Sequence, residues 1–203
     1  MKTIKIILIG DTNVGKSTIL YRYKYNNNFL LSHLPQSSTI GIDFDSTFIS
    51  HKDNLFKLSI WDTGGQERYR NISNIFYRNI NIVLIVFSFD DKKSFDNLEY
   101  WVNQCNHHID NNFKIFIIGN KSDIYNKKVS REEIDLFIQK TKYKFYKVNC
   151  LDHNKISELF INIINNYFEK QKRIDENDSD ILIQKNKNIE LNLKHSKKKC
   201  CKS

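Results

Sequence analysis

Residues 10–17 read Gly-Asp-Thr-Asn-Val-Gly-Lys-Ser and fit the phosphate-loop pattern G-x-x-x-x-G-K-[ST]. The loop follows an apolar run at residues 4–9 and precedes a segment of helical character, which is the context that the pattern requires. Backbone N–H groups in such a loop point at phosphates, and the next helix adds its positive end. Lys16 supplies a charge and Ser17 a magnesium ligand, so we expect a bound nucleoside triphosphate. The residues expected at its phosphates are Asn13, Val14, Gly15, Lys16, Ser17 and Thr18.

Glycine is scarce in this chain, which has six glycines, one proline and no alanine among its 203 residues. Asn and Asp serve ordinary turns here, so a retained glycine indicates backbone that needs positive φ or close approach to a ligand. The glycines fall in four short segments, and each segment contains other candidate site residues. These segments are residues 10–17, 39–44, 61–67 and 119–123.

Length and composition favour one folded domain with an appendage, because 40% hydrophobic residues can fill a single core. We predict a nucleotide-binding domain over residues 1–171 and a flexible tail over 172–203, where apolar periodicity fades. The N-terminus lacks the apolar stretch of a signal peptide, and the apolar run near 82–89 is too short for a bilayer span. Cys105 and Cys150 are expected to be reduced core residues of a cytosolic protein.

The formal charge of +9 raises the possibility of nucleic-acid binding. From Lys185 to the end, seven lysines and one acidic residue, Glu190, contribute +6 of that charge. The basic field therefore belongs to the tail rather than to a folded face with interleaved aromatics. This distribution favours an anionic membrane surface over nucleic acid as the partner.

Alternating apolar and amphipathic segments predict an α/β fold, with a six-stranded, mostly parallel sheet and five helices on both faces. Residues 51–54 read as a hairpin turn between the second and third strands, and the other strands need parallel crossovers. Ligands of such sheets bind beyond the carboxyl ends of the strands. The strands are expected at residues 4–9, 42–49, 55–61, 82–88, 113–118 and 144–149, and the helices near 16–25, 68–78, 92–108, 130–140 and 155–170.

Two further segments carry chemistry. Asp62-Thr63-Gly64-Gly65-Gln66 can supply a carboxylate near magnesium, an N–H group for a terminal phosphate from Gly65, and an amide from Gln66 that orients water. Asn120-Lys121-Ser122-Asp123 supplies a carboxylate, Asp123, which accepts from the paired N–H donors of guanine where adenine has no match. The ordered set of motifs therefore predicts GTP rather than another triphosphate.

At this point the sequence resembles the small GTPases, and more narrowly the Rab family, over the folded domain and the terminus. Residues 40–44, 57–61, 68–72 and 76–79 are similar to Rab signature segments, and the ending Cys200-Cys201-Lys202-Ser203 is similar to the Rab double-cysteine terminus. The resemblance implies the P-loop small GTPase fold. It also implies a switch that cycles between GDP and GTP, hydrolyses GTP slowly without an activating protein, and recruits effectors in vesicular traffic.

The resemblance also implies residue roles. Ser17 and Thr39 would bind Mg²⁺ directly, Asp62 would reach it through water, Gln66 would position the attacking water, and Gly65 and Thr39 would contact the terminal phosphate. The guanine would lie against Asn120, Lys121, Asp123, Cys150, Leu151 and Phe29, although strict counting places Asn28 where Phe29 is expected. Effectors would grip a surface formed by Ile40, Gly41, Phe44, Trp61 and Phe76.

The third guanine motif departs from the family, because Asn149-Cys150-Leu151 stands where Ser-Ala-Lys is usual. Cys150 can still offer its backbone N–H, but Leu151 lacks the stem and charge of a lysine. Faster nucleotide exchange is the hypothesis that follows.

The tail predicts a membrane anchor. Lys197-Lys198-Lys199 suits anionic lipid, and prenyl groups on Cys200 and Cys201 would add the second signal that stable attachment needs. Implied partners are effectors, an exchange factor, a GTPase-activating protein, an escort protein and a GDP-dissociation inhibitor, acting on a monomer without nucleic acid. The expected location is the cytoplasmic face of an endomembrane (endosome, Golgi, endoplasmic reticulum or vesicles), with an extracted cytosolic pool.

Two alternatives stay open at this stage. A module of the same fold could hold nucleotide without cycling, although Gln66, Thr39 and Ser17 argue against it. A basic RNA-binding protein would bind RNA tightly even without residues 185–203.

Overall fold

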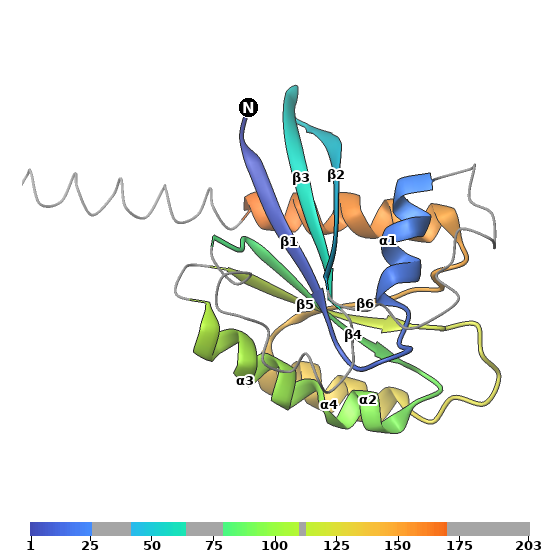
Figure 1. Ribbon diagram of the computed structural model, residues 1–203. Coiled ribbons are helices and arrows are strands. Elements are labelled where there is room, and N and C mark those ends of the chain that lie inside the picture. The colour runs from blue at the N-terminus through green and yellow to red at the C-terminus, as the bar shows by residue number, and fades with distance from the viewer. Residues whose placement is uncertain (26–41, 64–78, 110–112, 170–203) are drawn as a thin grey trace, which may run out of the picture. The chain divides into compact units, whose positions relative to one another are not determined.

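The computed structural model describes residues 1–25, 42–63, 79–109 and 113–169. The chain divides into two compact units, residues 1–163 and residues 164–203. The first unit contains the sheet (Figure 1). The predicted boundary between residues 171 and 172 lies outside the described residues and stays a prediction.

The centre of the fold is a six-stranded sheet in the order β2-β3-β1-β4-β5-β6. Among the described strands, the β2–β3 pair is antiparallel and every other adjacent pair is parallel, which confirms the prediction of a mostly parallel sheet. β4 is buried at every position, which explains the continuous apolar run at residues 82–87 before its last residue, Ser88. The strands are β1 (Thr3–Ile9), β2 (Ile42–His51), β3 (Asn54–Thr63), β4 (Ile82–Ser88), β5 (Lys114–Asn120) and β6 (Lys144–Lys147).

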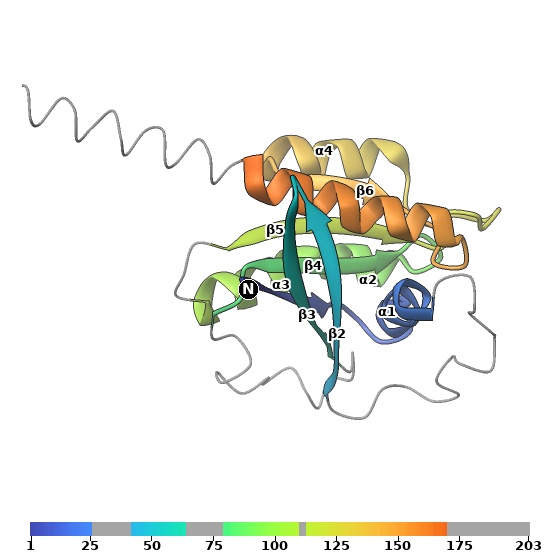
Figure 2. The ribbon, with the colours of Figure 1, turned by 90° about the horizontal axis from the view of Figure 1, so that it is seen from above.

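The predicted hairpin joins β2 to β3 through a two-residue turn, in which His51 pairs with Asn54. Lys52 and Asp53 both adopt positive φ, 46° and 61°, which is the backbone of the tight turns that suit twisted strands. Figure 2 shows β2 and β3 crossing the direction of β5 and β6. A rotation of about 20 to 25° between neighbouring strands accumulates to such a crossing over six strands.

Helices cover both faces of the sheet within the first unit. α1 (Lys16–Tyr25) lies on one face, and α2 (Lys92–Asp96), α3 (Leu98–His108) and α4 (Arg131–Thr141) lie on the other (Figure 1). A further helix spans residues 153–169. The ring of its Phe160 stacks on the ring of Tyr23 of α1, with centroids 3.8 Å apart. The helix predicted near residues 68–78 falls outside the described residues.

The prediction of a single helix over residues 92–108 was wrong. Asn97 separates α2 from α3: its N–H donates to the Lys93 and Phe95 carbonyls as the C-cap of α2, and it is at the same time the N-cap of α3. The predicted last strand was also too long, since β6 ends at Lys147 rather than at residue 149. The chain leaves the strand there to bring the Cys150 N–H to Asn120.

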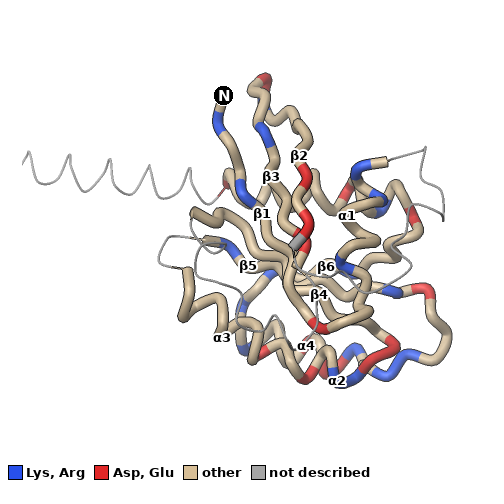
Figure 3. The backbone as a smooth tube through the Cα atoms, in the orientation of Figure 1, with Lys and Arg blue, Asp and Glu red and all other residues tan. Residues whose placement is uncertain are grey.

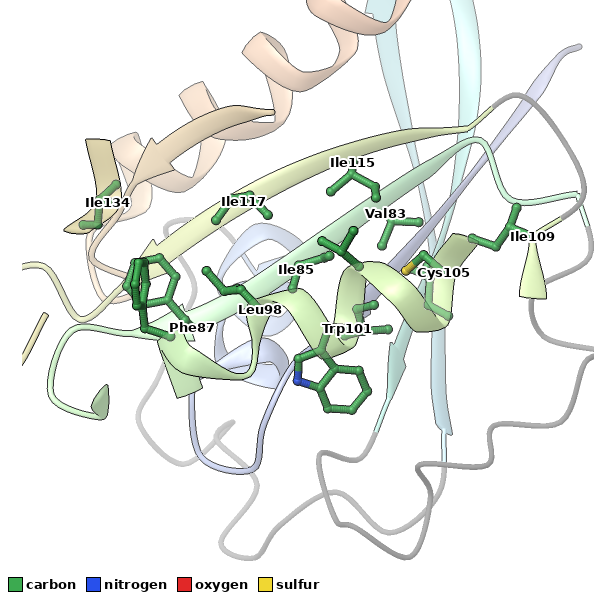
Figure 4. Close-up of a cluster of buried hydrophobic side chains, with 14 of the residues drawn as sticks. Val83, Ile85, Phe87, Leu98, Trp101, Cys105, Ile109, Ile115, Ile117 and Ile134 are labelled. Carbon is green, nitrogen blue, oxygen red and sulfur yellow. The ribbon is translucent and has the colours of Figure 1, made fainter. Parts of the chain in front are cut away.

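A core of buried hydrophobic side chains fills the space between the sheet and helices α2, α3 and α4 (Figure 4). Cys105, from α3, is fully buried in it, and Cys105 and Cys150 are both free thiols, as predicted. Its labelled members in Figure 4 are Val83, Ile85, Phe87, Leu98, Trp101, Cys105, Ile109, Ile115, Ile117 and Ile134.

Acidic and basic residues lie close together on the helices of this face (Figure 3). Lys92 of α2 pairs with Glu133 of α4 at 2.6 Å, and Lys140 of α4 pairs with Glu99 of α3 at the same distance. Within the ranges that the structure describes, no helix has the length and apolar character needed to cross a bilayer.

Candidate nucleotide site

The predicted phosphate loop joins the end of β1 to the start of α1, and two of its positions require glycine. Gly10 has φ of +140°, and a Cβ there would lie 2.1 Å from the Val86 carbonyl oxygen. Gly15 has φ of +97°, and a Cβ there would lie 2.2 Å from the Asn120 side-chain nitrogen. Asn13 also takes positive φ, 61°. At Gly10 and Gly15 the loop therefore passes so close to its neighbours that only glycine fits.

Lys16 lies inside this loop and is 5% exposed. Its ammonium donates to the carbonyl oxygens of Gly10 at 3.0 Å and Asp11 at 2.7 Å. Burial lowers the pKa of Lys16 to about 8, although the carboxylates of Asp62 and Asp11 oppose the shift. A buried cation without a full counter-charge is stabilised by an anionic ligand such as phosphate.

The first turn of α1 contains Ser17 and Thr18, both half-buried. The Ser17 hydroxyl donates to the carboxylate of Asp62, which is fully buried near the end of β3. The next residue, Thr63, donates its hydroxyl to the Leu8 carbonyl at 2.8 Å and so fixes the end of β3 against β1. The Ser17 hydroxyl and the Asp62 carboxylate thus lie together at the N-terminus of α1, and both are oxygen ligands of the kind that Mg²⁺ prefers.

Asn120 connects the phosphate side of the site to the opposite side. Its buried side-chain N–H₂ donates to the Val14 carbonyl at 2.8 Å, and its side-chain oxygen accepts from the Cys150 N–H at 3.0 Å. The amide thus bridges the phosphate loop and the segment at residues 149–151. Two motifs that the sequence places far apart meet at one side chain.

The residues after Asn120 turn sharply, because Lys121 has φ of 57°. The Lys121 ammonium lies 3.1 Å from the carboxylate of Asp90. Partial desolvation raises the pKa of Asp90, but hydrogen bonds from Ser88 and Lys121 outweigh it and hold that pKa below its usual value. Asp123 is exposed, so its carboxylate is accessible to a ligand.

The segment at residues 149–151 presents backbone rather than charge. Cys150 is buried, whereas the Leu151 side chain is 45% exposed. The Leu151 N–H donates to the Asn149 side-chain oxygen at 2.9 Å, and the guanidinium of Arg22 from α1 donates to the Leu151 carbonyl. Asn120 and Arg22 therefore hold the segment from outside, and the bond between Leu151 and Asn149 stabilises it from within.

Comparison with known proteins identifies the family. The model of the Ras family matches residues 5–169 of this chain. Ras-related protein Rab-11B of Dictyostelium discoideum is 37% identical over 162 residues, which cover 79% of this chain and 72% of that protein. The chain belongs to the Ras family. Ras-related protein rab-11.1 of Caenorhabditis elegans is 34% identical over 166 residues (81% and 77% covered), and GTP-binding protein ypt3 of Schizosaccharomyces pombe is 31% identical over 207 residues (97% and 95% covered).

These relatives assign the chain to the Rab branch of the Ras family. It is a Rab-type small GTPase: it binds guanine nucleotide, hydrolyses GTP and acts as a switch in vesicular membrane traffic. As in other Rab proteins, effectors and regulators interact with the switch, and the chain associates with vesicles and endomembranes.

Two of the predicted Rab effector residues are described, and they lie side by side. Phe44 of β2 pairs directly with Trp61 of β3, with ring centroids 4.7 Å apart, and Phe44 is 47% exposed. The Lys5 ammonium lies 5.6 Å from the centroid of the Trp61 ring. Predicted site residues that fall outside the described residues are Phe29, Thr39, Ile40, Gly41, Gly65, Gln66, Phe76, Cys200 and Cys201.

Sequence reasoning missed three side chains that support segments of this site through contacts with distant parts of the chain. Arg22 supports residues 149–151, Asp90 pairs with Lys121, and the Asp11 side chain bonds to the α2–α3 junction and α3. Arg22 and Asp90 belong to no spaced motif, and Asp11 occupies a variable position of the phosphate-loop pattern. Their partners lie 129, 31, and 86 and 90 residues away along the chain, so only the folded structure reveals them.

Proposed function

We propose that the described site holds one GTP or GDP with Mg²⁺, and that its residues act as the sequence predicts. The observation that carries this proposal is the Asn120 bridge, which joins the phosphate loop to the segment at residues 149–151 within one buried amide. A ligand spanning both segments would have phosphates at one end and a base at the other. Guanine nucleotide has that shape.

The phosphates would bind in the loop over residues 13–18. Lys16 would contribute its ammonium, and the N-terminus of α1 would contribute backbone N–H groups and a positive dipole. The lowered pKa of Lys16 supports its role as a phosphate ligand, because a bound anion stabilises the charged form that burial disfavours. Binding of phosphate and protonation of Lys16 therefore reinforce each other.

The guanine would lie against residues 120–123 and 149–151. Exposed Asp123 would accept from the two N–H donors of the base, and the backbone at Cys150 and Leu151 would border the carbonyl edge of the base. Lys121 and Phe29 would flank the ring. The ion pair with Asp90 would restrict where the Lys121 ammonium can lie beside the base.

Mg²⁺ would be held by the Ser17 hydroxyl and by Thr39, with Asp62 reaching it through water. The contact between Ser17 and Asp62 supports this set, since both are oxygen ligands at the phosphate end. When bound, the ion would neutralise phosphate charge as the terminal bond breaks. Gln66 would orient the attacking water, and Gly65 and Thr39 would hold the loops that differ between the GTP and GDP states.

The contact between exposed Phe44 and half-buried Trp61 supports an effector surface, which Ile40, Gly41 and Phe76 would complete. Aromatic side chains bury a large area on binding at a small entropic cost, so they are common at the centre of interfaces. An exchange factor and a GTPase-activating protein would set the time spent in each nucleotide state.

The tail would anchor the protein through prenyl groups on Cys200 and Cys201, aided by the preceding lysines. An escort protein would present the tail for prenylation, and a GDP-dissociation inhibitor would extract the GDP form into the cytosol. The membrane form would face the cytoplasm on an endosome, the Golgi, the endoplasmic reticulum or vesicles.

Single-turnover GTP hydrolysis tests the proposed roles. We expect intrinsic hydrolysis on the order of 10⁻⁴ to 10⁻³ s⁻¹ in magnesium buffer and at least a tenfold loss in Gln66→Leu. Gln139→Leu, which makes the same change at an exposed position of α4, serves as the control and should hydrolyse GTP at the wild-type rate. A protein that holds GTP but responds to neither Mg²⁺ removal nor Gln66→Leu would contradict the proposal and favour the non-cycling module.

A further inference from the structure

The phosphate loop contains a carboxylate that the nucleotide roles leave unexplained. Asp11 follows Gly10 directly, yet its side chain bonds to helices outside the loop. Asn97, between α2 and α3, donates its side-chain N–H to one Asp11 oxygen at 2.6 Å. The indole N–H of Trp101, in α3, donates to the other oxygen at 2.8 Å. Each oxygen of the carboxylate therefore has a neutral donor.

A negative charge in a phosphate loop needs such restraint. Phosphates and a carboxylate repel each other, and the repulsion is strong in a partly buried site where water screens poorly. The same carboxylate also attracts the ammonium of Lys16, which donates to the Asp11 carbonyl. A carboxylate free to reach Lys16 would compete with the phosphates for the buried cation of the loop.

We propose that Asn97 and Trp101 are positioning residues that hold the Asp11 carboxylate against α3, away from Lys16 and the phosphates. The inference rests on the proposed nucleotide role of the loop and adds to it a dependence on α3. Tight nucleotide binding then requires two hydrogen bonds from outside the loop. Movement of α3 relative to the loop would release the carboxylate and speed nucleotide release.

The two donors are fixed well enough for this task. Trp101 is 5% exposed and belongs to the core between the sheet and helices α2 to α4 (Figure 4). Its neighbours one turn away on α3, Leu98 and Cys105, are fully buried. The Asn97 backbone N–H caps α2 by donating to the Lys93 carbonyl at 3.0 Å. Asn97 is thus held at the end of α2 and Trp101 by the packing of α3.

The test exchanges the two partners. Asn97→Asp replaces the donor by a second carboxylate with almost no change in shape, so Asp11 is repelled toward the loop. We expect GDP to dissociate about tenfold faster, because a hydrogen bond to a charged group is lost and a repulsion is gained. Asp11→Asn alone removes the charge and should stay within about threefold of the wild-type rate.

The double variant Asp11→Asn with Asn97→Asp decides the matter, since it restores an amide facing a carboxylate with the positions reversed. We expect its GDP dissociation rate to return to within about threefold of wild type. Asn103→Asp, an exposed change on α3 with the same charge, should not alter the rate. Fluorescent GDP and a nonhydrolysable GTP analogue serve as probes, and the acceleration should be larger for the more highly charged triphosphate.

Trp101→Phe gives a second route, because it removes one donor while keeping most of the packing. We expect a threefold to tenfold faster release that Asp11→Asn again reverses, with folding checked by circular dichroism. Rates unchanged in Asn97→Asp, or accelerated rates that Asp11→Asn does not reverse, would overturn the inference. Failure of the wild-type protein to retain guanine nucleotide would instead contradict the proposed function.

Discussion

The phosphate end and the guanine end of the site are built in different ways. At the phosphate end a buried ammonium, Lys16, is surrounded by carbonyl oxygens, and glycines let the loop pass close to β4 and β5. At the guanine end Asp123 is exposed and Leu151 is 45% exposed, and the ordered groups there belong to the backbone. The difference shows why the phosphate loop keeps the family pattern while residues 149–151 depart from it.

A buried charge restricts the sequence because each neighbour either solvates it or opposes it. An exposed side chain at the rim restricts the sequence less, because water can replace what it supplies. Asn120 is the point at which the two ends depend on each other. Variants at this residue, at the phosphate end and at the guanine end should therefore differ in the size of their effects, in that order.

The largest effect is expected from Asn120→Ala. The change removes both hydrogen bonds of a fully buried amide and leaves the Val14 carbonyl and the Cys150 N–H without these partners. Each loss costs about 1 to 3 kcal/mol. We expect the free energy of unfolding, measured in urea, to fall by about 2 to 5 kcal/mol, and GDP dissociation to accelerate by about 100-fold.

Asn81→Ala is the matched control for this variant. The Asn81 side-chain oxygen accepts from the Lys5 N–H at 2.8 Å, at the end of the sheet away from the loop. Its loss should lower stability by about 1 kcal/mol without a change in GDP dissociation. Equal dissociation rates in the two variants would mean that Asn120 supports the fold and does not connect the two ends of the site.

A second, smaller effect isolates the buried ammonium at the phosphate end. In the nucleotide-free protein the pKa of Lys16 is about 8, against 10.5 for an ordinary lysine. Between these values the unfolded chain binds more protons than the folded one, so the free energy of unfolding rises with pH across this window. The two pKa values correspond to a gain of about 3 kcal/mol from pH 8 to above pH 10.

Urea unfolding of nucleotide-free wild type and Lys16→Met over this pH range measures the contribution of Lys16. Other groups titrate in the same range, so the quantity to compare is the difference in the free energy of unfolding between the two proteins at each pH. We expect wild type to gain stability relative to Lys16→Met as the pH rises from about 8 to about 10. Parallel curves would show that the ammonium of Lys16 is not destabilised by burial. Bound GDP should abolish the difference, because phosphate restores the charged form.

The sequence predicted more of the phosphate end than of the guanine end, for a physical reason. Loop residues such as Gly10 and Lys16 act together within one turn of chain, so their spacing is visible in the sequence. The mostly parallel sheet and the hairpin turn at residues 51–54 follow from equally local patterns. The supports of the site do not: Asp11 meets Trp101 across 90 residues, and Arg22 meets Leu151 across 129.

The helix predicted over residues 92–108 also shows that contacts between distant residues are not visible in local sequence patterns. Its apolar spacing continues through Asn97, so periodicity alone predicts one helix. The break at Asn97 coincides with the bond from its side chain to Asp11, which is a tertiary contact. Residues whose role depends on such contacts look like ordinary polar or core positions until the fold is known.

The smallest effect is expected at Leu151, where the guanine end departs from the family. Leu151→Lys adds an aliphatic stem and a charge beside the base, at a position where the side chain is 45% exposed and Arg22 already holds the carbonyl. We expect GDP to dissociate about two to five times more slowly, equivalent to at most about 1 kcal/mol. Leu136→Lys, the same change at a leucine of α4 that is 66% exposed, should leave the rate unaltered. If Leu151→Lys also left the rate unaltered, Arg22 and the backbone would already supply everything that this segment gives to the base, and the exchange rate would be set at the phosphate end alone.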